Sequence, residues 1–212
     1  MYLWGNVSGY VVSYYHMLGD EKATMTLAVA CLPLSFFVQT CFNPLGAFWQ
    51  KKYNPKLVIL LGVSIMSGSI LFASYMKTWW SFVAFYCFGY PAGIGIVYWV
   101  PIMCGWEWFP ENKGLVSGLV VGGYGFGAFI FGFVTTAIAN PENLKASVPS
   151  DGSTTDKIFP DSVAEQVPYM YRFCFWIWTA LGLLAVFGVS RNPEFVRQEK
   201  VRLRMEKIQK IS

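Results

Sequence analysis

Residues 114–136, GLVSGLVVGGYGFGAFIFGFVTT, decide the class of this protein. The stretch carries no charge over about 23 positions, enough for a helix to cross the roughly 30 Å hydrocarbon core of a bilayer. Gly114, Gly118 and Gly122 are spaced by four, as are Gly123 and Gly127. Glycines at this spacing let another helix approach closely in lipid. The stretch predicts a spanning helix that packs tightly against a neighbour, or one that slides against it as transporter helices do.

The composition of the whole chain also indicates that lipid surrounds much of its surface. Of 212 residues, 55% are hydrophobic and 13% are charged, whereas a soluble domain has roughly 25% charged residues. No basic stripe interleaved with aromatic residues indicates a nucleic-acid partner. The five cysteines lie in or beside apolar runs without a CxxC pair, which predicts free thiols and neither a disulfide framework nor a metal site. No cofactor is expected.

Apolar runs separated by polar turns predict an all-α polytopic membrane protein with six spans. The spans are expected at residues 2–15, 23–49, 57–76, 80–106, 114–136 and 169–189. The first covers about 21 Å as a helix, so it is expected to be the second half of a truncated span. Residues 1–191 are expected to form the bundle, with an exposed loop at 140–168. Residues 192–212 predict a basic amphipathic tail that lies on an anionic membrane surface or contacts a partner.

Lysine and arginine counts at the span ends predict the orientation. One side collects Lys51, Lys52, Lys56 and Lys113, together with the basic tail. The basic side should face the cytoplasm, or the matrix in a mitochondrial membrane. The chain is therefore expected to be integral to the mitochondrial inner membrane or the plasma membrane.

Polar side chains on the apolar spans are the candidates for a solute pathway. Asn6, Tyr10 and Tyr14 are each one helical turn apart and share a face, and Tyr98 lies on the fourth span. We expect these four residues to line a substrate cavity, although bonds between helices would use the same groups. The spans hold no cluster of histidine or carboxylate residues and no HExxH motif, so a membrane enzyme is not expected.

Three stretches resemble the N-terminal six-helix half of the major facilitator superfamily. The resemblance is to its oxalate/formate antiporter and monocarboxylate-carrier-like branch. Residues 2–15, YLWGNVSGYVVSYY, are similar to the later half of its first helix. Residues 89–132, GYPAGIGIVYWVPIMCGWEWFPENKGLVSGLVVGGYGFGAFIFG, are similar to its fourth helix, WFP-containing loop and glycine-rich fifth helix. The basic loop at residues 50–56, QKKYNPK, is similar to its motif A in position.

The loop departs from the family pattern in its chemistry. Gln50 or Lys51 stands where the family has a gating acid, and Lys52 and Lys56 complete the basic set, so these four residues are interpreted as a remnant of the gating loop. The resemblance implies half of a carrier for small organic anions, since such carriers have about twelve spans. The expected partners are membrane lipids and a second six-helix half. The alternative is an accessory subunit of a larger membrane complex, for example a mitochondrial respiratory assembly.

Overall fold

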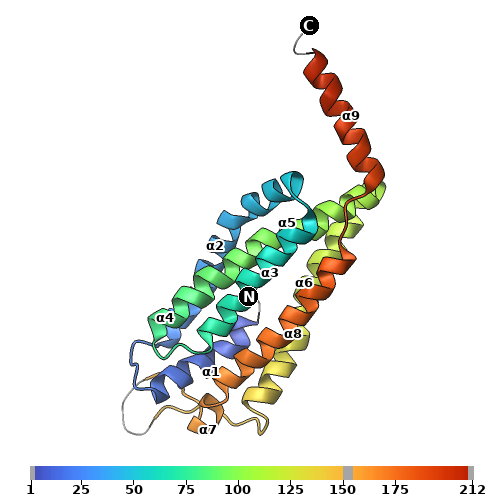
Figure 1. Ribbon diagram of the computed structural model, residues 1–212. Helices are drawn as coiled ribbons and strands as arrows, with labels where there is room; N and C mark the ends of the chain where they lie inside the picture. The colour runs from blue at the N-terminus through green and yellow to red at the C-terminus, as the bar shows by residue number, and fades with distance from the viewer. Residues whose placement is uncertain (1–2, 150–154, 210–212) are drawn as a thin grey trace.

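The computed structural model describes residues 3–149 and 155–209 and is helical almost throughout (Figure 1). Residues 1–2, 150–154 and 210–212, which belong to the predicted first span, loop and tail, lie outside this range. The helices are α1 (Trp4–Met17), α2 (Met25–Lys52), α3 (Pro55–Ala73), α4 (Trp79–Val83), the π-helical turn η1 (Ala84–Gly89), α5 (Tyr90–Trp108), the 3-10 turn η2 (Pro110–Asn112), α6 (Lys113–Ala139), α7 (Asp161–Ala164), α8 (Val167–Gly188) and α9 (Pro193–Gln209).

Five of these helical segments are long and apolar enough to cross a membrane. They are Met25–Lys52, Pro55–Ala73, Trp79–Trp108, Pro110–Ala139 and Asp161–Gly188. The shorter α1 has 14 residues and packs beside them, as the short first apolar run predicted. The structure confirms an all-α polytopic membrane protein.

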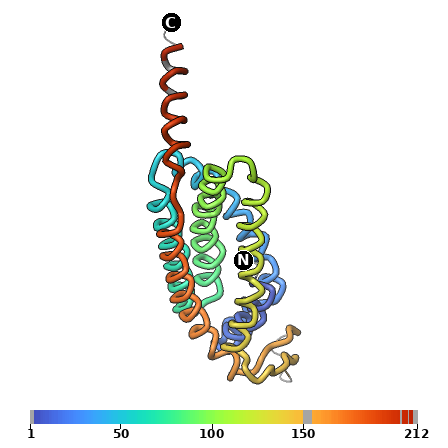
Figure 2. The backbone as a smooth tube through the Cα atoms, turned by 90° about the vertical axis from the view of Figure 1, so that its right-hand side faces the viewer, coloured from blue at the N-terminus to red at the C-terminus, as the bar shows by residue number. Residues whose placement is uncertain are grey.

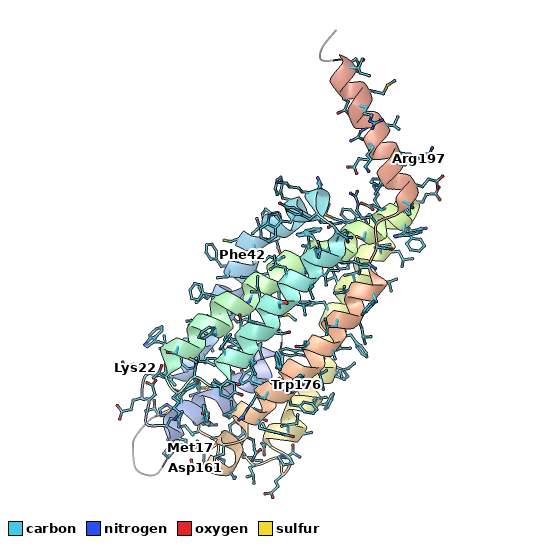
Figure 3. The ribbon with its side chains drawn as sticks, viewed as in Figure 1. Met17, Lys22, Phe42, Asp161, Trp176 and Arg197 are labelled. Atoms are coloured by element: carbon cyan, nitrogen blue, oxygen red, sulfur yellow. The ribbon has the colours of Figure 1, made fainter. Side chains whose placement is uncertain are left out.

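The helices alternate in direction along the bundle (Figures 1 and 2). Figure 3 shows Met17, Lys22 and Asp161 near one end of the bundle and Arg197 on α9 beyond the other. The α2–α3 turn and the α5–α6 connection lie at the end from which α9 leaves (Figure 1). This agrees with the predicted gathering of the basic loop and tail on one side. The apolar side chains Val201 and Met205 of α9 are 57% and 64% exposed, and contact of this tail with a membrane surface stays a prediction.

An aromatic core joins α1 to α4 and η1. Trp4 lies 4.6 Å from Tyr86 between ring centroids, and Phe82 lies 5.1 Å from Tyr86. Tyr15 adds an edge-on contact with Trp79 at 5.8 Å. Trp4 also donates its indole N–H to the carbonyl of Ala28 at 2.6 Å, which ties α1 to α2. These contacts hold α1 in the bundle although it is too short for a full crossing.

Glycines bring α5 into close contact with α2 and α3. A Cβ on Gly93 would lie 2.5 Å from Met66 N and 2.6 Å from Gly62 O, and one on Gly95 would lie 2.5 Å from Gln39 O. Only hydrogen on the α-carbon fits at these distances. The small-residue packing expected in a membrane bundle is therefore concentrated on α5 and its neighbours.

Five glycines of α6, unlike those of α5, make no close contact with the other described helices. A Cβ built on Gly114, Gly118, Gly122, Gly123 or Gly127 meets no described atom within 4 Å. The helix α6 contacts the bundle at other positions, where Val116 faces Gly105, Tyr124 meets Tyr98 and Gly132 faces Asn6. The tight contact expected at these five glycines is not made within the described chain, and contact with another chain or segment stays a prediction.

Residues 155–166 of the predicted loop make specific contacts with the bundle. Phe159 donates its backbone N–H to Ser13 Oγ at 2.9 Å, and its ring lies 4.7 Å from that of Tyr10. The carboxylate of Asp156 accepts from the backbone N–H of Met25 at 2.8 Å, at the start of α2. The segment thus covers the end of α1 and caps α2.

Candidate functional site

The candidate site is a cavity of about 420 Å³ bounded by α3, α5, α6 and α8, with a contribution from α1. Among the described residues that line it, none is charged. The polar lining side chains are Tyr86, Tyr90, Tyr98, Tyr124, Thr135, Tyr171 and Cys174. A volume in this range is typical of pockets that hold a small organic ligand.

Stacked aromatic rings form one wall of the cavity. Tyr86 of η1 and Tyr90 at the start of α5 have ring centroids 5.6 Å apart. Tyr90 stacks on Trp178 of α8 at 5.9 Å, and Tyr171 meets Tyr86 edge-on at 6.0 Å. The wall is therefore rigid, because each ring is held by another.

Two hydroxyl groups of the cavity lining differ in their hydrogen bonding. Thr135 donates its hydroxyl to the carbonyl of Phe131 at 2.7 Å, so this donor is already used. The hydroxyl of Tyr171 is buried, and the described residues provide it with no hydrogen-bond partner. A buried donor without a partner is uncommon in folded proteins and needs an explanation.

One of the four predicted lining residues reaches this cavity. Tyr98 lines it and meets Tyr124 edge-on at 6.2 Å. Asn6 is exposed beside Gly132, Tyr10 is buried against Phe159, and Tyr14 packs on Tyr15 at 5.2 Å near the end of α1.

The helical spacing of Asn6, Tyr10 and Tyr14 was a sound reason to group them, but their face of α1 turns away from the cavity. Leu3 and Val7 line it from α1 instead. Whether any of the predicted residues contacts a substrate stays a prediction. Tyr171 and Trp178 were missed as lining residues, because the sequence does not show which way the aromatic residues of the last span face.

A charged cluster lies at the basic end of the bundle. Glu107, at the end of α5, is 8% exposed and lies 2.7 Å from Arg191 Nη2. Arg191 Nη2 also donates to Glu199 Oε2 of α9 at 2.9 Å, and the backbone N–H of Asn192 donates to Glu107 Oε2 at 3.2 Å. The hydrogen bond to Glu107 raises the pKa of Arg191 above its ordinary value. The cluster fastens α5 to the link between α8 and α9.

The gating-loop remnant lies at the same end. Gln50 is buried, and its Nε2 donates weakly to Cys104 Sγ at 3.5 Å, one turn before Glu107 on α5. Lys51 and Lys52 are exposed, and Lys56 is half-buried in the first turn of α3. Gln50 thus contacts a helix of its own bundle, and a gating role for these four residues stays a prediction.

No family model matches the chain. It is 26% identical to Apicoplast pyruvate carrier 1 of Toxoplasma gondii over 237 aligned positions, covering 91% of this chain and 43% of that protein. It is 24% identical to the Oxalate:formate antiporter of Oxalobacter formigenes over 145 positions, covering 66% of this chain and 34% of that protein. The chain spans less than half the length of either relative. With the apolar helices, the comparisons support a transporter-like integral membrane protein.

Proposed function

We propose that this chain is one half of a major-facilitator carrier for small organic anions of the monocarboxylate, oxalate and formate type. The observation that carries the proposal is the extent of the similarity to the pyruvate carrier. It runs through 91% of this chain but occupies 43% of that protein, a share expected for one of two halves.

The geometry of α6 supports a missing second half. Large apolar side chains on its outer surface, such as Leu119 and Phe126, are more than 60% exposed, and a Cβ on Gly122 would meet nothing within 4 Å. In lipid such a surface suits either acyl chains or a closely packed helix. A second six-helix half placed there would complete the carrier.

The uncharged lining of the cavity supports an expectation about the chemistry of the second half. An anion buried in a low-dielectric site is costly unless a cation or several donors accompany it. The described lining of the cavity holds neither lysine, arginine nor histidine. The positive group that pairs with a carboxylate is therefore expected on the second half, facing this chain.

The alternative is an accessory subunit that retains the half-carrier fold without transport. The position of Tyr10 and Tyr14 favours it, since both pack on other aromatic side chains rather than line the cavity. In a mitochondrial respiratory assembly or a similar complex, the open surface of α6 would then contact an unrelated subunit.

Transport assays on the assembly distinguish the two. The protein would be extracted with a mild detergent in its native assembly, the assembly's mass and subunits determined, and proteoliposomes tested with labelled pyruvate, oxalate and formate. The carrier proposal expects a second six-helix half and saturable uptake above empty vesicles. It is overturned if such an assembly shows no flux for any of the three, or if the partners are unrelated subunits and uptake equals the vesicle background.

A further inference from the structure

We propose that the cavity bounded by α5, α6 and α8 binds a neutral, lipid-soluble ring compound that carries a hydrogen-bond acceptor. This ligand differs in chemistry from the organic anion of the proposed transport function, and its binding is measured without a transport assay. Four features of the cavity carry this inference: its charge, its opening, its wall and its free donor.

The lack of charge selects a neutral ligand. Every described side chain lining the cavity is uncharged, and most are aliphatic or aromatic. Burying a carboxylate with no cation beside it is strongly unfavourable, whereas an apolar ring gains free energy by leaving water. The small anions that the relatives are named for are therefore poor ligands for this cavity.

The exposed lining residues indicate that the ligand enters from the lipid phase. Gly123 of α6 and Leu181 and Ala185 of α8 line the cavity and are also exposed on the surface. All three lie within segments apolar enough to span the membrane. These residues place an edge of the cavity at the apolar surface of α6 and α8, where a lipid-soluble compound is concentrated in a bilayer.

The aromatic wall selects a flat ring. The stack of Tyr86, Tyr90 and Trp178 is continuous, with neighbouring centroids 5.6 and 5.9 Å apart. A planar ring packs well on such a surface because offset stacking adds to the burial of its area. A volume of about 420 Å³ accommodates one substituted ring.

The free donor selects a ligand with an acceptor. Tyr171 lines the cavity, and its buried hydroxyl has no partner among the described residues. A carbonyl or ether oxygen on the ligand would accept this hydrogen bond and remove the cost of leaving the donor unsatisfied. This feature distinguishes the proposed ligand from an acyl chain, which has no acceptor at this depth.

Three matched probes test the chemistry of the ligand. Tetramethyl-1,4-benzoquinone is a neutral ring with two acceptors, tetramethylbenzene is a similar ring without them, and 2,4,6-trimethylbenzoate is a charged ring. Binding of each labelled probe to the full chain in lipid nanodiscs is measured by equilibrium dialysis, with empty nanodiscs subtracted. We expect saturable binding of the quinone, weaker binding of the hydrocarbon and none of the benzoate.

Matched variants locate the binding. Gly127→Leu places a side chain into the cavity from a position where a Cβ meets nothing within 4 Å, and Gly122→Leu adds the same side chain on α6 at a position that does not line it. We expect Gly127→Leu to weaken quinone binding about tenfold or more and Gly122→Leu to change it less than about twofold. Tyr171→Phe should weaken quinone binding about fivefold and leave hydrocarbon binding unchanged, while Tyr169→Phe on the exposed side of α8 changes neither.

Several results would overturn the proposal. They are no saturable binding of the quinone, benzoate binding as tightly as the quinone, equal losses in Gly127→Leu and Gly122→Leu, or equal losses of quinone and hydrocarbon binding in Tyr171→Phe. The transport assay has a separate readout, so failure of either proposal leaves the other intact.

Discussion

Replacing Gly93 with alanine tests the close contact between α3 and α5. The new Cβ would lie 2.5 Å from Met66 N, 2.6 Å from Gly62 O and 2.8 Å from Met66 Cβ, all on α3. Ordinary contact begins at 3.4 Å, and two of the three atoms belong to the backbone, which cannot rotate away. The helices α3 and α5 must therefore separate by about 0.9 Å to bring the shortest of these distances to ordinary contact.

The expected cost follows from this displacement. Overpacking of this kind costs about 1–3 kcal/mol, and the upper end applies because backbone atoms are involved. Alanine offsets about 1 kcal/mol through its greater helix propensity. The net loss in unfolding free energy is about 2 kcal/mol, or about 30-fold in the folding equilibrium.

Unfolding of the purified chain in detergent micelles with increasing SDS, followed by tryptophan fluorescence, measures this loss. Gly118→Ala is the matched control, because a Cβ at Gly118 meets nothing within 4 Å. We expect that variant to be unchanged or more stable by up to about 1 kcal/mol. If Gly93→Ala and Gly118→Ala unfold at the same SDS concentration, the close α3–α5 contact described above is wrong.

Two further changes probe the attached segments. Glu107→Ala should lower the unfolding free energy by about 2 kcal/mol and speed tryptic cleavage at Arg191, because the half-buried guanidinium loses its main partner. The exposed Glu206→Ala should cost less than about 0.5 kcal/mol, and equal effects of the two would contradict the reasoning. Ser13→Ala removes the acceptor of the Phe159 N–H, so hydrogen exchange at that amide should accelerate about fivefold, and an unchanged rate would argue against the contact.

The spans could be predicted because each corresponds to a continuous apolar run in the sequence. A helix that crosses a bilayer needs about 20 apolar residues, and such runs appear between short polar turns. The sequence also indicated that α1 would be short and that the basic loop and tail would share one end. These features depend on neighbouring residues alone, so no knowledge of packing was required.

The cavity could not be predicted because it depends on which way each helix faces. Tyr98 and Tyr10 look alike in sequence, yet one lines the cavity and the other packs on Phe159. Glu107 is buried and pairs with Arg191 from 84 residues later, a partner that the residues around Glu107 do not indicate. The glycine spacing in α6 indicated a close contact but not its partner, and within this chain the closest contacts fall on α5.

The ion pairs of Arg191 couple α9 mechanically to the end of α5. The link between Gly188 and Pro193 is short and irregular, and such a link alone would act as a hinge. Arg191 spans it by holding Glu107 on one side and Glu199 on the other. A sideways force at the far end of α9, about 25 Å away, is thereby delivered as a torque on the end of α5, the helix against which α2 and α3 pack most closely.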